Sequence, residues 1–163
     1  MTDIYSSAKR SELMAKVRGR DTAIERTLRS ALHRFGLRFR LNVSTLPGRP
    51  DIVLPRFHTV IFVHGCFWHR HKGCKRASIP KSNQAFWKAK FSANVKRDQL
   101  VTRALRKAGW NVLVVWQCEI GKNLLKSARQ ICHRIKHSDD GRKQALKGCQ
   151  KSRLELALRP TSR

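Results

Sequence analysis

Residues 51–63 read DIVLPRFHTVIFV and contain two short apolar runs, over 51–54 and 59–63. Isoleucine, valine and phenylalanine dominate these runs, and such residues favour β-strands. The residues between the runs begin with Pro55, which is typical of a turn. We therefore predict two paired strands in the centre of a sheet, because runs with so few polar residues require cover on both faces.

Helical patterns flank these strands. Apolar residues repeat at helical spacing over residues 21–36, where Thr22 and Glu25 can form a capping box. The other expected elements are a strand over 37–43, a helix over 82–108 that breaks near Ser92 and buries Phe86 in the core, a strand over 110–116 and a helix over 124–135. This order predicts a single α/β (α+β) domain with a mixed central sheet flanked by helices.

The chain of 163 residues is strongly basic, with 36 Lys and Arg against 10 Asp and Glu and a formal net charge of +26. So many like charges repel one another unless a polyanion neutralises them, which makes nucleic acid the first partner to consider. A hydrophobic share of 40% supports a folded core and argues against a disordered basic protein. We expect a domain over residues 1–137 and a basic C-terminal extension over 138–163, where seven Lys or Arg face three acids.

The sequence contains no apolar run long enough to cross a membrane, and its N-terminus lacks the apolar centre of a signal peptide. We therefore expect a cytoplasmic protein without a membrane partner. Its five cysteines are an odd, unevenly spaced set, which favours metal ligation or buried thiols over a disulfide framework. We expect Cys132 to be a core thiol and Cys149 to have no special role.

Residues 64–74 read HGCFWHRHKGC and hold three of the seven histidines and two of the five cysteines. Thiolate and imidazole ligands suit Zn²⁺, and a loop without its own core is the kind of segment that a structural zinc stabilises. Three ligands can come from this loop, with Cys118 as the fourth. The spacing fits Cys66, Cys74 and either His71 or His69; the alternative is a set of unrelated thiols and imidazoles.

An acidic residue, Asp51, begins one predicted strand, and His64 ends the next. A carboxylate at such a position can bind a hard cation such as Mg²⁺, although a Pro-Asp pair is more often only a turn. His64 and His69 can both move protons near neutral pH. For Glu25 the simpler role is the capping box, and for Asp98 it is a surface ion pair.

Aromatic residues gather in the same part of the sequence. Phe67 and Trp68 are neighbours in the histidine-rich loop, and Trp87 lies near the start of the long helix. Apolar side chains on a basic surface are what proteins use to separate stacked bases, and a mismatched step is easier to open. The pattern therefore indicates a wedge against distorted DNA, with ordinary core burial as the alternative.

Taken together, these residues resemble the very short patch repair (Vsr) DNA mismatch endonucleases. The resemblance covers most of residues 5–120, and its parts are RDTAIE at 20–25, LPGRPD at 46–51, VIFVHGCFWH at 60–69, FW at 86–87, NV at 94–95, RD at 97–98, GW at 109–110 and VVWQC at 114–118. It implies a fold similar to the type II restriction endonucleases. It also implies an enzyme that nicks duplex DNA 5′ of the thymine in a T:G mispair left by deamination of 5-methylcytosine, the first step of very short patch repair.

The resemblance also implies roles for individual residues. Asp51 and the carbonyl of Val63 would bind Mg²⁺, and His69 would act as the general base. The supporting catalytic residues would be His64, Glu25 and Asp98. The zinc ligands would be Cys66, His71, Cys74 and Cys118. The wedge would comprise Phe67, Trp68 and Trp87, and further contacts with the mispair or its neighbours would come from Met14, Lys90 and Asn94.

A single active site suits a mispair without two-fold symmetry, so we expect a monomer. The expected partners are DNA with a T:G mismatch and other mismatch-repair proteins. A zinc-containing protein that binds distorted DNA without cutting it would share the charge, the wedge and the metal loop, but would not explain Asp51 beside the histidines. A third possibility is a basic protein that stacks tryptophans on single-stranded RNA.

Overall fold

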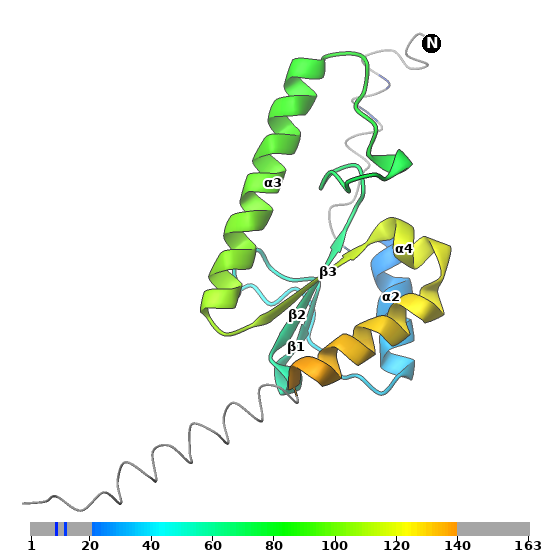
Figure 1. Cartoon of the computed structure of the whole chain (residues 1–163), viewed down its shortest axis with the longest axis vertical. Helices are drawn as coiled ribbons and strands as arrows, with labels where there is room; N and C mark the ends of the chain where they lie inside the picture. Colours follow the sequence, from blue (N-terminus) through cyan, green and yellow to red (C-terminus); the bar gives the residue numbers. More distant parts are fainter. Residues whose placement is uncertain (1–8, 10–11, 13–20, 140–163) are drawn as a thin grey trace, which may run out of the picture.

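The computed structural model describes residues 9, 12 and 21–139 (Figure 1). Its elements are helix α2 (Ala23–Arg34), strand β1 (Ile52–Leu54), 3-10 turn η1 (Pro55–Phe57), strand β2 (Thr59–His64), 3-10 turn η2 (Lys75–Ala77), helix α3 (Gln84–Lys107), strand β3 (Asn111–Trp116) and helix α4 (Gln117–Lys122). A further helix, here called the last helix, covers residues 124–139. No helix within this described part has both the length and the apolar character needed to cross a bilayer.

The three strands form one sheet in the order β1-β2-β3. Strand β1 pairs antiparallel with β2, with Ile52 opposite Ile61, which confirms the predicted pairing. Among the described strands, however, β1 lies at an edge of the sheet and not in its centre. Strand β3 pairs parallel with β2, with Val60 opposite Val112 and His64 opposite Trp116. The sheet is therefore mixed, and the parallel pair brings the ends of β2 and β3 to the same edge.

Alternate residues along each strand face opposite sides of the sheet, and each side has its own core. One core joins the sheet to α2, α4 and the last helix through Leu28, Leu32, Ile52, Leu54, Ile61, Leu113, Val115, Ile120, Ile131 and Ile135. The other core joins the sheet to α3 through Val53, Val60, Val112 and Leu105. Figure 1 shows the result, with α3 on one side of the strands and α2, α4 and the last helix on the other.

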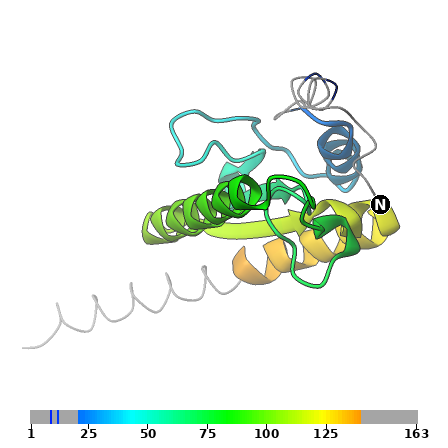
Figure 2. The same cartoon turned by 90° about the horizontal axis from the view of Figure 1, so that it is seen from above.

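Helix α3 extends beyond the sheet. Its C-terminal half packs on the strands through Leu105, whereas Trp87 and Phe91 are buried near its N-terminus, away from the strands. The connection between α2 and β1 passes beside α3 (cyan in Figure 2). There Gly48 has φ +72° and lies so close to Val101 that a Cβ atom would collide with it. Glycine at this position therefore lets the turn before Asp51 pack against the helix.

Several expectations need correction. The strand predicted over 37–43 is a single bridge between Arg40 and Val53, because Asn42 has φ 47° and ends the extended conformation. Helix α3 does not break near Ser92, which is exposed and leaves the backbone ladder intact. Phe86 is not a core residue, since 54% of it is exposed.

The C-terminal part contains more helix than the sequence indicates. Helix α4 was not predicted, and the last helix continues to residue 139 instead of ending at 135. Cys132 packs against the core, as expected. Of the predicted basic extension, only residues 138 and 139 are described, and they continue the last helix. Met14 and Cys149 lie outside the described residues.

Candidate active site and metal centre

Asp51 lies directly before β1, and the adjacent strand holds its side chain in place. The backbone N–H of Val63 on β2 donates a hydrogen bond of 2.7 Å to Asp51 Oδ2. Burial, together with the negative charge of Glu25, raises the pKa of Asp51 to about 6 despite the opposing effect of this hydrogen bond. The carboxylate is therefore costly to ionise in the folded chain, and a nearby cation would relieve that cost.

A cavity of about 480 Å³ opens beside Asp51. Its lining consists of Glu25, Gly48, Arg49, Asp51, Phe62, Val63, His64, His69, Arg97, Asp98 and Val101. All five residues predicted to be catalytic are in this lining, although they come from α2, the start of β1, the end of β2, the following loop and α3. The fold thus assembles two histidines and three carboxylates around one space.

The two histidines and Asp98 form a connected group. The rings of His64 and His69 stack with centroids 3.8 Å apart and an angle of 12° between their planes. His69 Nδ1 lies 2.5 Å from Asp98 Oδ2. Such a bond fixes the ring and leaves Nε2 as the nitrogen that can accept a proton. Asp98 is therefore more than the surface ion pair considered from the sequence, although Arg97 also lies 3.7 Å from its other oxygen.

Burial and neighbouring charges shift the pKa values of His64 and Asp98, so that one is neutral and the other is ionised. Burial lowers the pKa of His64 to about 4, and the positive charge of His69 adds to the effect, so His64 is neutral at physiological pH. Burial alone would raise the pKa of Asp98, but the hydrogen bond and charge of His69 outweigh it and lower that pKa. Asp98 thus stays ionised and stabilises a positive charge on His69.

Glu25 is 4% exposed and is held by three donors. Its Oε2 accepts hydrogen bonds from Arg29 Nη2 at 2.8 Å and from the backbone N–H of Asp21 at 3.0 Å, and its Oε1 accepts one from the Thr22 hydroxyl at 2.8 Å. Thr22 also caps α2, as predicted, by accepting a hydrogen bond from the backbone N–H of Glu25. The return half of the predicted capping box differs, because Glu25 Oε2 accepts from the backbone N–H of Asp21 instead of that of Thr22. This network fixes a buried carboxylate at the rim of the Asp51 cavity.

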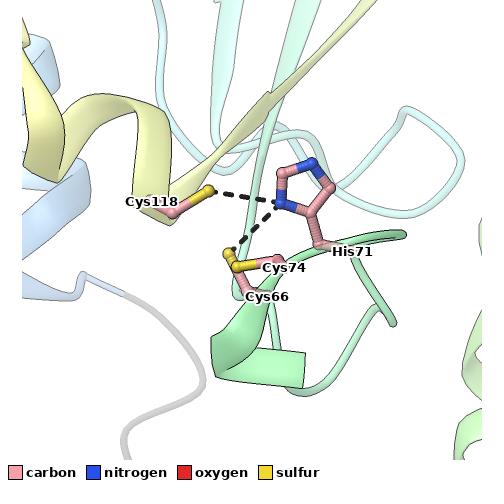
Figure 3. Close-up of side chains that lie close together, drawn as sticks. All are labelled: Cys66, His71, Cys74 and Cys118. Carbon is pink, nitrogen blue, oxygen red and sulfur yellow. Dashed lines mark hydrogen bonds between the residues drawn. The ribbon is translucent and has the colours of Figure 1, made fainter. Parts of the chain in front are cut away.

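A second group of side chains, here called the Cys/His group, lies where the loop after β2 meets α4 (Figure 3). It contains Cys66, His71 and Cys74 from the loop after β2, and Cys118 from α4. One ligand atom from each residue lies within 4.8 Å of the others. Atoms that bind a tetrahedral ion at about 2.0–2.3 Å lie about 3.3–3.8 Å from one another, so a small contraction would suffice to bind one.

His71 is the histidine of this group. Its Nδ1 lies 3.2 Å from Cys118 Sγ and 3.6 Å from Cys66 Sγ, as Figure 3 shows. His69, the other histidine that the spacing allowed, points to Asp98 instead. Desolvation and the two neighbouring thiols raise the pKa of Cys118 to about 11. Without a cation, a thiolate at Cys118 is unfavourable beside the other thiols, and a bound metal ion would offset that cost.

The aromatic residues form one cluster between the loop and α3. Phe67 makes edge contacts with Trp68, Trp87 and Phe91 at centroid distances of 5.0, 5.4 and 5.0 Å. Phe67 and Trp68 are partly exposed, whereas Trp87 is only 7% exposed and lies behind them.

Two polar residues of α3 that were predicted to contact DNA differ in how they are held. Asn94 Nδ2 donates to the backbone carbonyl of Trp68 at 3.1 Å, which fixes the loop on the helix. Lys90 is exposed on the same helix.

Sequence reasoning missed four residues of this region. Arg49 and Arg97 line the Asp51 cavity, Arg29 holds Glu25, and Trp116 contacts both His64 and His71. The spacing of four residues between Glu25 and Arg29 is a signal for an ion pair on one helix face. Arg49, Arg97 and Trp116 lie in the stretches that carry the resemblance, but their contacts depend on how the elements pack.

Comparison of the sequence with known proteins shows which family the chain belongs to. The profile described as DNA mismatch endonuclease Vsr matches residues 2–76. The type II nicking enzyme V.XorIIP of Xanthomonas oryzae pv. oryzae is 51% identical over 120 residues, which are 74% of this chain and 88% of that protein. DNA mismatch endonuclease Vsr of Escherichia coli is 44% identical over 120 residues, 74% of this chain and 76% of that protein.

A third relative, the type II nicking enzyme V.NmeAIP of Neisseria meningitidis, is 44% identical over 74% of this chain and 85% of its own length. The profile match covers α2, β1, β2 and the loop as far as Cys74, and so includes Glu25, Asp51, His64 and His69. The chain therefore belongs to the Vsr family of DNA mismatch endonucleases.

Proposed function

We propose that this endonuclease nicks one strand of duplex DNA 5′ of the thymine in a T:G mispair, with Mg²⁺, and so begins very short patch repair. The observation that carries the proposal is the meeting of Asp51 with the stacked His64 and His69 in one cavity. The names of the relatives support it, because one is a mismatch endonuclease and others are nicking enzymes. A protein that only binds DNA would not need a buried carboxylate beside two histidines, because the burial of that charge lowers stability.

The residues beside Asp51 fit Mg²⁺. Hard cations prefer oxygen ligands, and Asp51 offers a carboxylate whose pKa is raised to about 6 in the absence of a cation. Val63, whose carbonyl is the second proposed ligand, is tied to the same carboxylate by its N–H. When bound, Mg²⁺ would stabilise the charge that develops on the phosphate.

The two histidines would handle the proton that the attacking water loses. His69 would accept a proton from the attacking water at Nε2, because its Nδ1 is held by Asp98. Asp98 remains ionised and would stabilise the imidazolium that results. His64 stays neutral and would keep the ring of His69 in place by stacking. Glu25, fixed by Arg29, would position water at the edge of the cavity.

We assign a structural Zn²⁺ to Cys66, His71, Cys74 and Cys118. These ligands join the loop after β2 to α4, and the loop has few buried apolar residues of its own. A bound ion would therefore replace the core that the loop lacks. It would also hold the wedge residues in position, because Phe67 and Trp68 lie between two of the ligands in sequence.

The aromatic cluster would recognise the mismatch. Phe67 and Trp68 are partly exposed and would enter the opened base step, and the buried Trp87 would support them from behind. Lys90, Asn94 and Met14 would contact the mispair or its neighbours. A net charge of +26 would supply the attraction to phosphate, and affinity should therefore fall steeply with salt.

The remaining proposals concern the fold type, the domain bounds, the oligomeric state and the location of the protein. The mixed sheet between helices supports a fold of the type II restriction endonuclease kind, in a domain over residues 1–137 followed by a basic extension over 138–163. One Asp51 cavity per chain is enough for a single nick, so we propose a monomer. We propose that it works in the cytoplasm on the nucleoid, alongside other mismatch-repair proteins.

The first prediction concerns strand cleavage. With Mg²⁺ and a T:G duplex labelled on each strand, we expect one cut, 5′ of the thymine. Asp51→Asn should lower the rate by about 10²-fold or more, because the charge at the metal ligand is lost. The same variant should bind the duplex at least as tightly, since one negative charge near the phosphates is removed. Tight binding without a cut by the parent protein would instead identify a non-catalytic binder of distorted DNA.

The second prediction concerns stability. In the folded chain Asp51 has a pKa of about 6, against 3.8 for the ordinary group, so the folded state holds a proton that the unfolded state releases. Stability should therefore fall as pH rises from about 4 to 6, by about 1–3 kcal/mol from this group. In magnesium-free buffer, Asp51→Asn should melt above the parent at pH 7 and equally at pH 4. Equal melting temperatures at both values would contradict the burial of the charge.

The third prediction concerns the Cys/His group. Purified protein should contain about one zinc per chain, in line with a four-ligand structural site. Cys118→Ser should lose most of that zinc and unfold at a lower temperature. Cys132→Ala is the matched control, because Cys132 is a partly buried thiol outside the group. If the two variants retain equal zinc, the ligand assignment is wrong.

A further inference from the structure

The exposed side of the last helix carries a pair of histidines remote from the Cys/His group in sequence. His133 and His137 are one helical turn apart, and both are exposed. Their Nε2 atoms lie 3.0 Å apart, with ring centroids at 4.2 Å and planes inclined by 60°. A hydrogen bond between two such nitrogens requires one to carry a proton and the other a lone pair. The two side chains therefore bring one nitrogen each to the same place, where the rings can share a proton.

We propose that His133 and His137 bind a divalent transition-metal ion that prefers square or octahedral coordination, Ni²⁺ or Cu²⁺, in place of this proton. Two nitrogens at about 2.05 Å from one ion and 3.0 Å from each other subtend an angle of about 94° at the ion. That angle is near the right angle of square-planar and octahedral sites and smaller than the tetrahedral angle of a structural zinc. Water would occupy the other positions.

The Cys/His group and the histidine pair would then differ in the ions that they select. The Cys/His group offers three soft thiolates and one imidazole, a set suited to zinc. The pair on the last helix offers imidazole alone. Imidazole binds Ni²⁺ and Cu²⁺ well, and Cu²⁺ comes highest in the general order of affinities. A metal there would link successive turns of the last helix.

The test is a Ni²⁺ titration of zinc-saturated protein without an affinity tag. We expect His133→Ala and His137→Ala each to weaken Ni²⁺ binding by about tenfold or more, because each removes one of two linked ligands. His33→Ala is the control, since His33 is exposed on α2 with no second histidine a turn away. Substoichiometric Ni²⁺ should broaden the NMR signals of His133 and His137 first. Equal affinity in all variants, or uniform broadening of every exposed histidine, would overturn the proposal.

A different set of contacts carries a second proposal, which rests on the proposed function. Trp116, the last residue of β3, lies between the Cys/His group and the catalytic histidines. Its ring stacks on His71 at a centroid distance of 4.1 Å and an angle of 4°. It also meets His64 edge to face at 5.3 Å and 75°. Because Trp116 is the register partner of His64, the backbone also fixes this contact.

We infer that Trp116 is a positioning residue that couples the metal ligand His71 to His64 and, through the His64 stack, to His69. The three contacts form a continuous row of rings that ends at the bond between His69 and Asp98. Packed rings can transmit a displacement of a few tenths of an ångström, since protein interiors are close-packed. Holding His71 would thereby hold His69 against Asp98.

The test compares Trp116→Leu with Trp116→Phe. Leucine should lower kcat by about tenfold while KM for the T:G duplex and zinc content stay within about twofold, because misplaced catalytic groups act on the chemical step. Phenylalanine, which keeps a flat ring, should restore most of kcat. An unchanged kcat, or a loss that follows zinc content alone, would overturn the coupling.

A second readout does not depend on activity. Removing zinc should shift the NMR signals of the His64 and His69 rings in the parent protein and in Trp116→Phe, and less so in Trp116→Leu. If the parent shows the larger shift but never nicks DNA, the proposed function fails and the coupling stands. If zinc removal leaves both signals unchanged, or shifts them equally in Trp116→Leu and the parent, the coupling fails. Should Trp116→Leu not fold, Trp116→Met takes its place, because methionine also lacks a flat ring.

Discussion

The parallel pairing of β2 with β3 is the constraint on which the rest of the structure depends. Its register sets His64 opposite Trp116, so the two strands end at the same edge of the sheet. The loop after β2 and helix α4 both start at that edge. Cys118 can therefore meet Cys66, although the two are more than fifty residues apart in sequence. A shift by one residue would turn His64 to the opposite face and separate it from His69.

The fold could be predicted where hydrophobic periodicity was strong. The residues of β1 and β2 are almost all apolar and pair as expected, and α2 begins at its predicted cap, Thr22. The hydrophobic pattern gave a wrong prediction where the backbone conformation of a single residue decides whether a strand forms. A positive φ at Asn42 prevents a strand that alternation alone would allow, and neither alternation nor composition reveals it. Helix α4 is short, and its buried residue Ile120 gives no repeating signal.

The site could be predicted as a set of residue types and only partly as contacts. Clustered Cys and His along a loop point to a metal, but spacing could not decide between His69 and His71. The choice follows from α3, which presents Asp98 to His69, and from β3, which presents Trp116 to His71. Arg29, Arg49 and Arg97 were missed because arginine is common in so basic a chain, and only packing distinguishes them from solvated residues.

The buried charges that the proposed chemistry requires lower the stability of the fold. This cost explains why the contacts that support them are so extensive. Asp51 and Glu25 place two negative charges near one cavity, and Asp51 is partly desolvated there. Such a pair would destabilise the fold if nothing compensated for it. Arg29 compensates Glu25 directly, whereas the N–H of Val63 is the hydrogen-bond donor that holds Asp51. The uncompensated part of the charge on Asp51 would give the cavity its affinity for the proposed cation, so a residue that neutralised it fully would stabilise the chain and remove the reason for a metal to bind.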